Sequence, residues 1–142
     1  MYMYNECNVR SRISLSMFLA VLITGGYTKE GWLKSAEIYL PESNSGCSLP
    51  ELPSKSSSHT QDGNLACGGQ LMDTSKKCIK WTDGSWTQSH SLRGNRYGHV
   101  SWATASGVYL MGGWNTESEM TSELVKEDGS VEEGFGLKYK TE

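Results

Sequence analysis

Apolar residues along this chain fall in short runs that are separated by turn-forming residues. The runs Val21–Thr24 and Val108-Tyr109-Leu110-Met111 are almost wholly apolar, a pattern typical of a β-strand covered on both faces. Asp83-Gly84 and Asp128-Gly129 each separate two strand-like runs. Asp-Gly in such a place is a strong hairpin signal, because the tight turn needs a positive φ at both central residues. The pattern therefore predicts an all-β fold of short antiparallel strands.

Three sequence landmarks recur in one order along the chain. A glycine pair follows a strand-like run three times, at Gly25-Gly26, Gly68-Gly69 and Gly112-Gly113, with offsets of 43 and 44 residues. The sequence Asp-Gly-Ser recurs after 45 residues, and a histidine, His59 or His99, precedes each of the later glycine pairs. Three landmarks at one period indicate an internal repeat of about 40–50 residues.

Each repeat unit is predicted to form three or four short strands. The second unit has them at residues 59–61, 64–68, 77–82 and 85–92, and the third at 99–103, 108–112, 122–126 and 130–139. The first unit lacks an opening strand and has strands at 21–25, 36–40 and 47–52. Four antiparallel strands in each 40–50 residues or so is typical of a β-propeller blade.

The second unit carries the fullest set of motif residues. Its second strand is followed by Gly68-Gly69, its third strand holds Trp81, its fourth opens with Trp86, and Arg96-Tyr97-Gly98-His99 leads into the next unit. This arrangement resembles the kelch repeat. WD-type repeats end in Trp-Asp, which occurs nowhere in this chain. The resemblance covers roughly residues 21–139, with Tyr39 at the aromatic position of the first unit.

The resemblance implies an all-β, kelch-type β-propeller fragment of about three four-stranded antiparallel blades, the first of them incomplete. We divide the chain into an N-terminal extension or signal-like segment (1–18), an incomplete first blade (19–54), a second blade (55–95) and a third blade (96–142). Known propellers close with about four to eight blades. We therefore expect the chain to be part of a longer protein, or to close its ring by self-association.

The motif residues have expected structural roles. Glycine after the second strand lets the backbone turn sharply and pack closely between blades. We expect Trp81, Trp86 and Trp102 to fill the wedge between neighbouring blades. His59 and His99 recur at the same position of the repeat. We therefore expect each to have a structural role, hydrogen-bonded to the backbone of a neighbouring blade, rather than a ligand-binding or catalytic role.

The four cysteines, at positions 7, 47, 67 and 78, form no Cys-x-x-Cys pair, so the spacing does not indicate a zinc site. Cys67 and Cys78 fall on neighbouring antiparallel strands, where a cross-strand disulfide is sterically conceivable. The alternative is two small buried thiols. A bridge would indicate an oxidising compartment, and an extracellular location is slightly favoured over a cytoplasmic one. Arg10 and Arg12 precede a short apolar run, as in a secretory signal, although unrelated sequence joined to the first strand is an alternative.

Composition narrows the function classes. The chain has 142 residues, with 13 Lys+Arg against 16 Asp+Glu, which argues against a nucleic-acid-binding surface. No run approaches the 18 or so apolar residues of a membrane-spanning helix. A nucleophile elbow and a phosphate-binding glycine loop are also absent from the sequence, and we expect no cofactor or metal.

The function expected from the sequence is that of a non-catalytic protein-interaction module. The loops that follow the glycine pairs emerge on one face of a propeller and combine aromatic with charged residues, a usual composition for protein recognition. Two alternatives stay open: a galactose-oxidase-like copper enzyme fragment, and an intracellular kelch adaptor that binds ubiquitin-ligase substrates or actin. The candidate residues of the binding face are Tyr27, Trp32, Asp73, Arg96, Trp114, Asn115 and Glu117.

Overall fold

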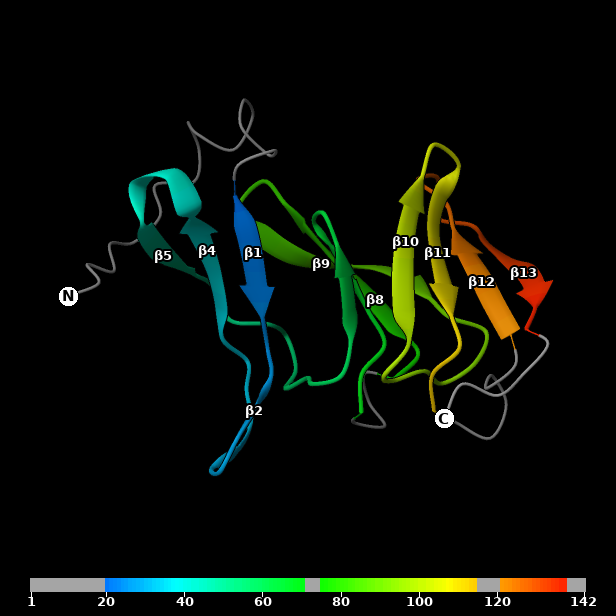
Figure 1. Ribbon diagram of the computed structural model, residues 1–142, viewed down its shortest axis with the longest axis horizontal. Helices are drawn as coiled ribbons and strands as arrows, with labels where there is room; N and C mark the ends of the chain where they lie inside the picture. Colours follow the sequence, from blue (N-terminus) through cyan, green and yellow to red (C-terminus); the bar gives the residue numbers. More distant parts are fainter. Residues whose placement is uncertain (1–19, 71–74, 115–120, 138–142) are drawn as a thin grey trace.

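The protein is all-β, and three of its sheets stand side by side (Figure 1). The computed structural model describes residues 20–70, 75–114 and 121–137. Within these residues the strands form four antiparallel sheets, each of which follows the order of the chain. In the same ranges no helix is long and apolar enough to cross a membrane.

The three larger sheets follow one another along the sequence. The first sheet has three strands and the other two have four each, and a separate two-stranded hairpin follows the first strand. The first sheet contains β1 (Val21–Thr24), β4 (Ala36–Leu40) and β5 (Ser45–Leu49), with the hairpin β2 (Tyr27–Thr28) and β3 (Gly31–Trp32) inserted and a 3-10 turn at Pro41–Ser43; the second contains β6 (Thr60–Asp62), β7 (Leu65–Cys67), β8 (Lys77–Thr82) and β9 (Ser85–Ser91); the third contains β10 (Val100–Thr104), β11 (Gly107–Met111), β12 (Thr121–Val125) and β13 (Val131–Gly136).

The predicted strand positions are confirmed for these three sheets, with shifts of a few residues at the ends. The predicted turn at Asp83-Gly84 is present between β8 and β9, with φ values of 50° and 84°, as a type I′ turn requires. The hairpin β2–β3 was not predicted, because two-residue strands leave no alternating pattern in a sequence.

The hydrophobic core lies between the sheets. One cluster joins Ala36 and Leu49 of the first sheet to Trp81 of the second, with Trp86 packed against it. Trp81 and Trp86 therefore fill the space between two sheets, as predicted. Trp102 does not, because its side chain points away from the second sheet and is 62% exposed.

A second cluster holds the second and third sheets together. The side chains of Cys67 and Cys78 meet Leu110 and Val125 there, and all four are buried. Burying apolar side chains contributes about 25 cal/mol for each Å² removed from water. Face-to-face contact between successive sheets therefore contributes to tertiary stability.

Backbone hydrogen bonds at the glycine pairs repeat from sheet to sheet. The amide of the first glycine donates to a carbonyl oxygen in the next strand of the same sheet, at the first residue of that strand or the residue just before it. The amide of the second glycine reaches the connection to the following sheet. The first set is Gly25 N to Ser35 O, Gly68 N to Lys77 O and Gly112 N to Thr121 O; the second is Gly26 N to Ser56 O and Gly69 N to Arg96 O, at 2.8 and 2.9 Å.

Gly68 shows why the first position of the pair is glycine. Its φ is +73°, in a region that L side chains rarely adopt. A Cβ atom at this position would lie 2.3 Å from the Arg96 carbonyl oxygen and 2.7 Å from His99 Cε1. The equivalent Gly25 would meet Ser56 O and His59 Cε1 in the same way. Each imidazole therefore sits against the glycine of the preceding sheet.

Candidate protein-binding face

The hairpin β2–β3 extends beyond the sheets, at the end where β1 and β11 terminate (Figure 1). Its two aromatic residues, Tyr27 and Trp32, are opposite each other in the hairpin register. Their rings make an edge contact, with centroids 5.8 Å apart. Tyr27 is 67% exposed. Aromatic rings held together in this way give an apolar surface that loses little side-chain entropy on binding.

Trp114 lies beyond β11 at the same end of the molecule. Its side chain is exposed, but its backbone is fixed, because the amide donates to Tyr97 O over 2.8 Å and the two residues form an isolated bridge. Tyr27, Trp32 and Trp114 are thus exposed as predicted. Asp73, Asn115 and Glu117 lie outside the described residues.

The prediction that Arg96 belongs to the binding face is wrong, because the Arg96 side chain is 0% exposed. Its guanidinium bonds Glu123 Oε1 at 3.0 Å, Thr121 Oγ1 at 3.0 Å and the Gly112 carbonyl oxygen. Glu123 is also buried, and its Oε2 accepts from the Arg93 amide at 2.8 Å. Arg96 therefore ties the connection after the second sheet to β12 of the third. Sequence reasoning missed Glu123, because no local pattern marks a buried carboxylate within an exposed-looking strand.

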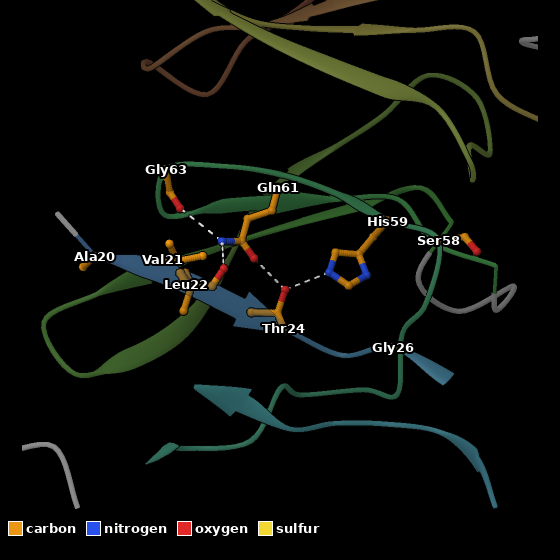
Figure 2. Close-up of a pocket in the computed structure, with 9 residues that line it drawn as sticks. All are labelled: Ala20, Val21, Leu22, Thr24, Gly26, Ser58, His59, Gln61 and Gly63. Carbon is orange, nitrogen blue, oxygen red and sulfur yellow. Dashed lines mark hydrogen bonds between the residues drawn. The ribbon is translucent and has the colours of Figure 1, made fainter. Parts of the chain in front are cut away.

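A hollow of 610 Å³ lies beside β1 and is lined by both polar and apolar side chains (Figure 2). Gln61 Nε2 donates to Leu22 O over 2.9 Å. The Thr24 hydroxyl donates to Gln61 Oε1 over 2.7 Å and therefore accepts from His59 Nε2 at 2.8 Å. Leu22 corresponds to Leu65 of the second sheet, which pairs with β6. The Gln61 side chain thus supplies β1 with a hydrogen bond that a neighbouring strand supplies elsewhere.

The hydrogen-bond partners of His59 and His99 differ from the predicted backbone groups. His59 bonds the hydroxyls of Thr24 and Ser56, and His99 Nε2 lies 2.7 Å from Thr60 Oγ1. Side-chain hydroxyls therefore take the place of the expected backbone groups. Burial lowers the pKa of His59, and burial together with the Arg96 and His59 charges lowers the pKa of His99 to about 3. Both imidazoles are neutral at pH 7, as such an interior requires.

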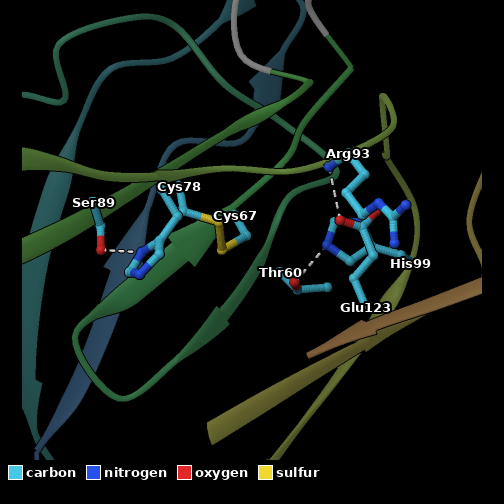
Figure 3. Close-up of a disulfide and its surroundings, with 8 residues drawn as sticks. Thr60, Cys67, Cys78, Ser89, Arg93, His99 and Glu123 are labelled. Atoms are coloured by element: carbon cyan, nitrogen blue, oxygen red, sulfur yellow. Dashed lines mark hydrogen bonds between the residues drawn. A yellow bond between two sulfur atoms is a disulfide. The ribbon is translucent and has the colours of Figure 1, made fainter. Parts of the chain in front are cut away.

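The predicted bridge between Cys67 and Cys78 is present and buried between the second and third sheets (Figure 3). The two residues are directly opposite each other in β7 and β8, with Cα atoms 4.1 Å apart. They form a non-hydrogen-bonded pair, since the neighbouring Gly68 and Lys77 make the ladder bond. Such pairs bring side chains closest in an antiparallel sheet.

The remaining motif residues occupy equivalent places in the sheets. Gly113 follows Gly112 after β11, where its Cβ would meet the Tyr97 carbonyl oxygen. Tyr39 lies on β4 and donates a hydrogen bond to Asn44 Oδ1 at 3.0 Å. In residues 20–70, 75–114 and 121–137 no group of three or more His, Cys, Asp or Glu side chains is placed to hold a metal ion.

Comparison with known proteins gives no assignment for this chain, since no family model matches it and no curated protein is significantly similar to it.

Proposed function

We propose that this chain is part of a kelch-type β-propeller and binds a protein partner, without catalysis, through the end of the sheets that carries the hairpin β2–β3. The observation that carries this proposal is the pair of aromatic rings, Tyr27 and Trp32, on an exposed hairpin. Aromatic residues are enriched among those that dominate binding energy at protein interfaces.

The propeller assignment is supported by the repeated construction of the sheets. Each is an antiparallel meander, and successive sheets pack face to face over an apolar core. The glycine-pair hydrogen bonds recur at equivalent residues, and β6 of the second sheet contacts β10 of the third. Radial packing of such sheets is how propellers are built.

The disulfide supports an extracytoplasmic location for this binding module. Disulfides form and persist in oxidising compartments and are rare in the cytosol. Cys67 and Cys78 are paired, and Cys47 is also disulfide-bonded. Mass spectrometry after thiol alkylation of the protein from its natural source would test this, because alkylated Cys67 and Cys78 would contradict an oxidising location.

The binding proposal is tested by selecting peptides on the immobilised chain from a displayed random library. We expect the selected peptides to lose at least about tenfold in affinity, or 1.4 kcal/mol, when Tyr27→Ser and Trp32→Ser are combined. Phe135→Ser is the matched control, because Phe135 is an exposed aromatic residue of β13, outside the hairpin. Peptides that bind the double variant as well as the unchanged chain would refute the proposal.

A further inference from the structure

In the described part of the chain, the second sheet covers one face of the third sheet, and no further sheet packs on the other, bare face. Leu110 and Val125 point toward the second sheet and are buried. Trp102, Tyr109 and Leu124 are opposite one another in β10, β11 and β12, so they share the other face. Leu124 is itself buried, at 7% exposed, whereas Trp102 and Val100, two residues apart on the same face of β10, are 62% and 59% exposed. Both hydrophobic clusters of the described residues lie elsewhere, between the sheets.

Among the described residues, the first sheet likewise has a bare face, on the side away from the second sheet. Leu22 and Ile38 point toward the second sheet and pack in the core. Val21 and Ile23 alternate with Leu22 along β1 and therefore point away from it. Ile23 is 51% exposed. Isolated exposed apolar side chains are common, but two at one face of an end sheet form a patch.

The internal repeat relates these two bare faces to each other. The glycine pairs align Ile23 of the first sheet with Leu110 of the third. Leu110 packs against the second sheet and is 1% exposed. The same alignment relates Tyr109 of the third sheet to Leu65 of the second, which packs against the third sheet. The bare faces are thus the two halves of an interface that the chain already forms twice within itself.

Charged residues follow the same relation. Glu37 of β4 pairs with Ile23, two residues before the first glycine pair, and Glu123 of β12 pairs with Leu110, two residues before the third pair. The two carboxylates therefore occupy equivalent positions. Glu123 pairs with Arg96, which lies in the segment after the second sheet. Glu37 therefore lies on the bare face of the first sheet, at the position that Glu123 takes against the second sheet.

We propose that a second copy of this chain packs its first sheet on the outer face of the third sheet, in a head-to-tail association. Such contacts close into a ring when the rotation allows it and otherwise extend into a chain of copies. Two copies would supply six of the larger, three- or four-stranded sheets, within the range of about four to eight blades that closed propellers use. The closed ring rests on the propeller assignment of the proposed function, but the association surface is distinct from the hairpin face, so failure of association and failure of peptide binding are distinguishable.

The test is the mass of the oxidised 142-residue chain in solution, measured by light scattering over a concentration series. We expect twice 15.7 kDa, or a multiple, at high concentration. Trp102→Lys and Ile23→Lys should each weaken association at least about tenfold. Both residues are exposed, so the variants should keep the thermal unfolding of the parent. Tyr27→Ser is the control and should associate as the parent does.

Mixing the two variants separates this geometry from other modes of association. Copies with Trp102→Lys keep an intact first sheet and copies with Ile23→Lys keep an intact third sheet, so a mixture should form a one-to-one complex that neither variant forms alone. A chain that stays monomeric at all concentrations would overturn the proposal. So would association that both variants leave unchanged, or a mixture that does not associate.

Discussion

Replacing Gly68 with alanine should destabilise the protein more than a backbone conformation alone requires. Gly68 has a φ of +73°, and placing an L residue in this region costs about 1–2 kcal/mol. The added Cβ would also lie 2.3 Å from the Arg96 carbonyl oxygen and 2.7 Å from His99 Cε1. Ordinary contact between such atoms begins at about 3.5 Å, and relieving overlap in a packed region costs about 1–3 kcal/mol more.

Gly63 offers a matched control for this prediction. It has a φ of +56° in the same sheet, but a Cβ there would have no atom within 4 Å. Gly63→Ala should therefore cost only the conformational part, about 1–2 kcal/mol. We expect Gly68→Ala to be less stable than Gly63→Ala by about 2 kcal/mol.

The measurement is urea unfolding followed by tryptophan fluorescence, with the free energy of unfolding extrapolated to water. Gly25→Ala should match Gly68→Ala, because its Cβ would lie 2.3 Å from Ser56 O. Equal stability of the Gly63 and Gly68 variants would refute the reasoning, since it would show that the connection after the second sheet moves away without cost.

Three further predictions concern the contacts between the second and third sheets. Replacing both Cys67 and Cys78 with alanine should lower the free energy of unfolding by about 3 kcal/mol, because the bridge closes a loop with a sequence separation of 11. Reduction of the unchanged protein also breaks the disulfide of Cys47, so it should give at least this loss in urea unfolding, and no loss from the double variant would contradict the entropy argument. Arg96→Met should cost about 3–5 kcal/mol because it leaves Glu123 buried without its charge partner, and combining it with Glu123→Met should recover part of that loss in the same assay. Burial lowers the pKa of His99 in the folded protein to about 3, from an ordinary value of 6.5, so the unfolded chain binds a proton that the folded chain excludes. Stability should therefore fall from pH 6.5 toward pH 3, by up to about 1.4 kcal/mol per pH unit, and the advantage of the parent over His99→Gln should shrink over that range.

Some of the fold could be predicted from the sequence because it depends on local rules. A positive φ at both turn residues selects Asp83-Gly84, and strand alternation fixes which residues of β8 and β11 share a face. The period of the glycine pairs gave the order of the sheets. The pairing of Cys67 with Cys78 was one of two alternatives, because sequence places the two strands side by side but does not settle the register.

Only the tertiary structure decided which residues of the motif are buried and which are exposed. Arg96 lies in a connection and Trp102 in a strand, and the residues beside them in the sequence do not indicate which of the two is buried. Arg96 is buried because Glu123, 27 residues away, meets it from another sheet. Trp102 is exposed because no further sheet of the described chain packs on its face. Local sequence determines strands and turns, whereas the burial of a side chain depends on which element from elsewhere in the sequence packs against its face of the sheet.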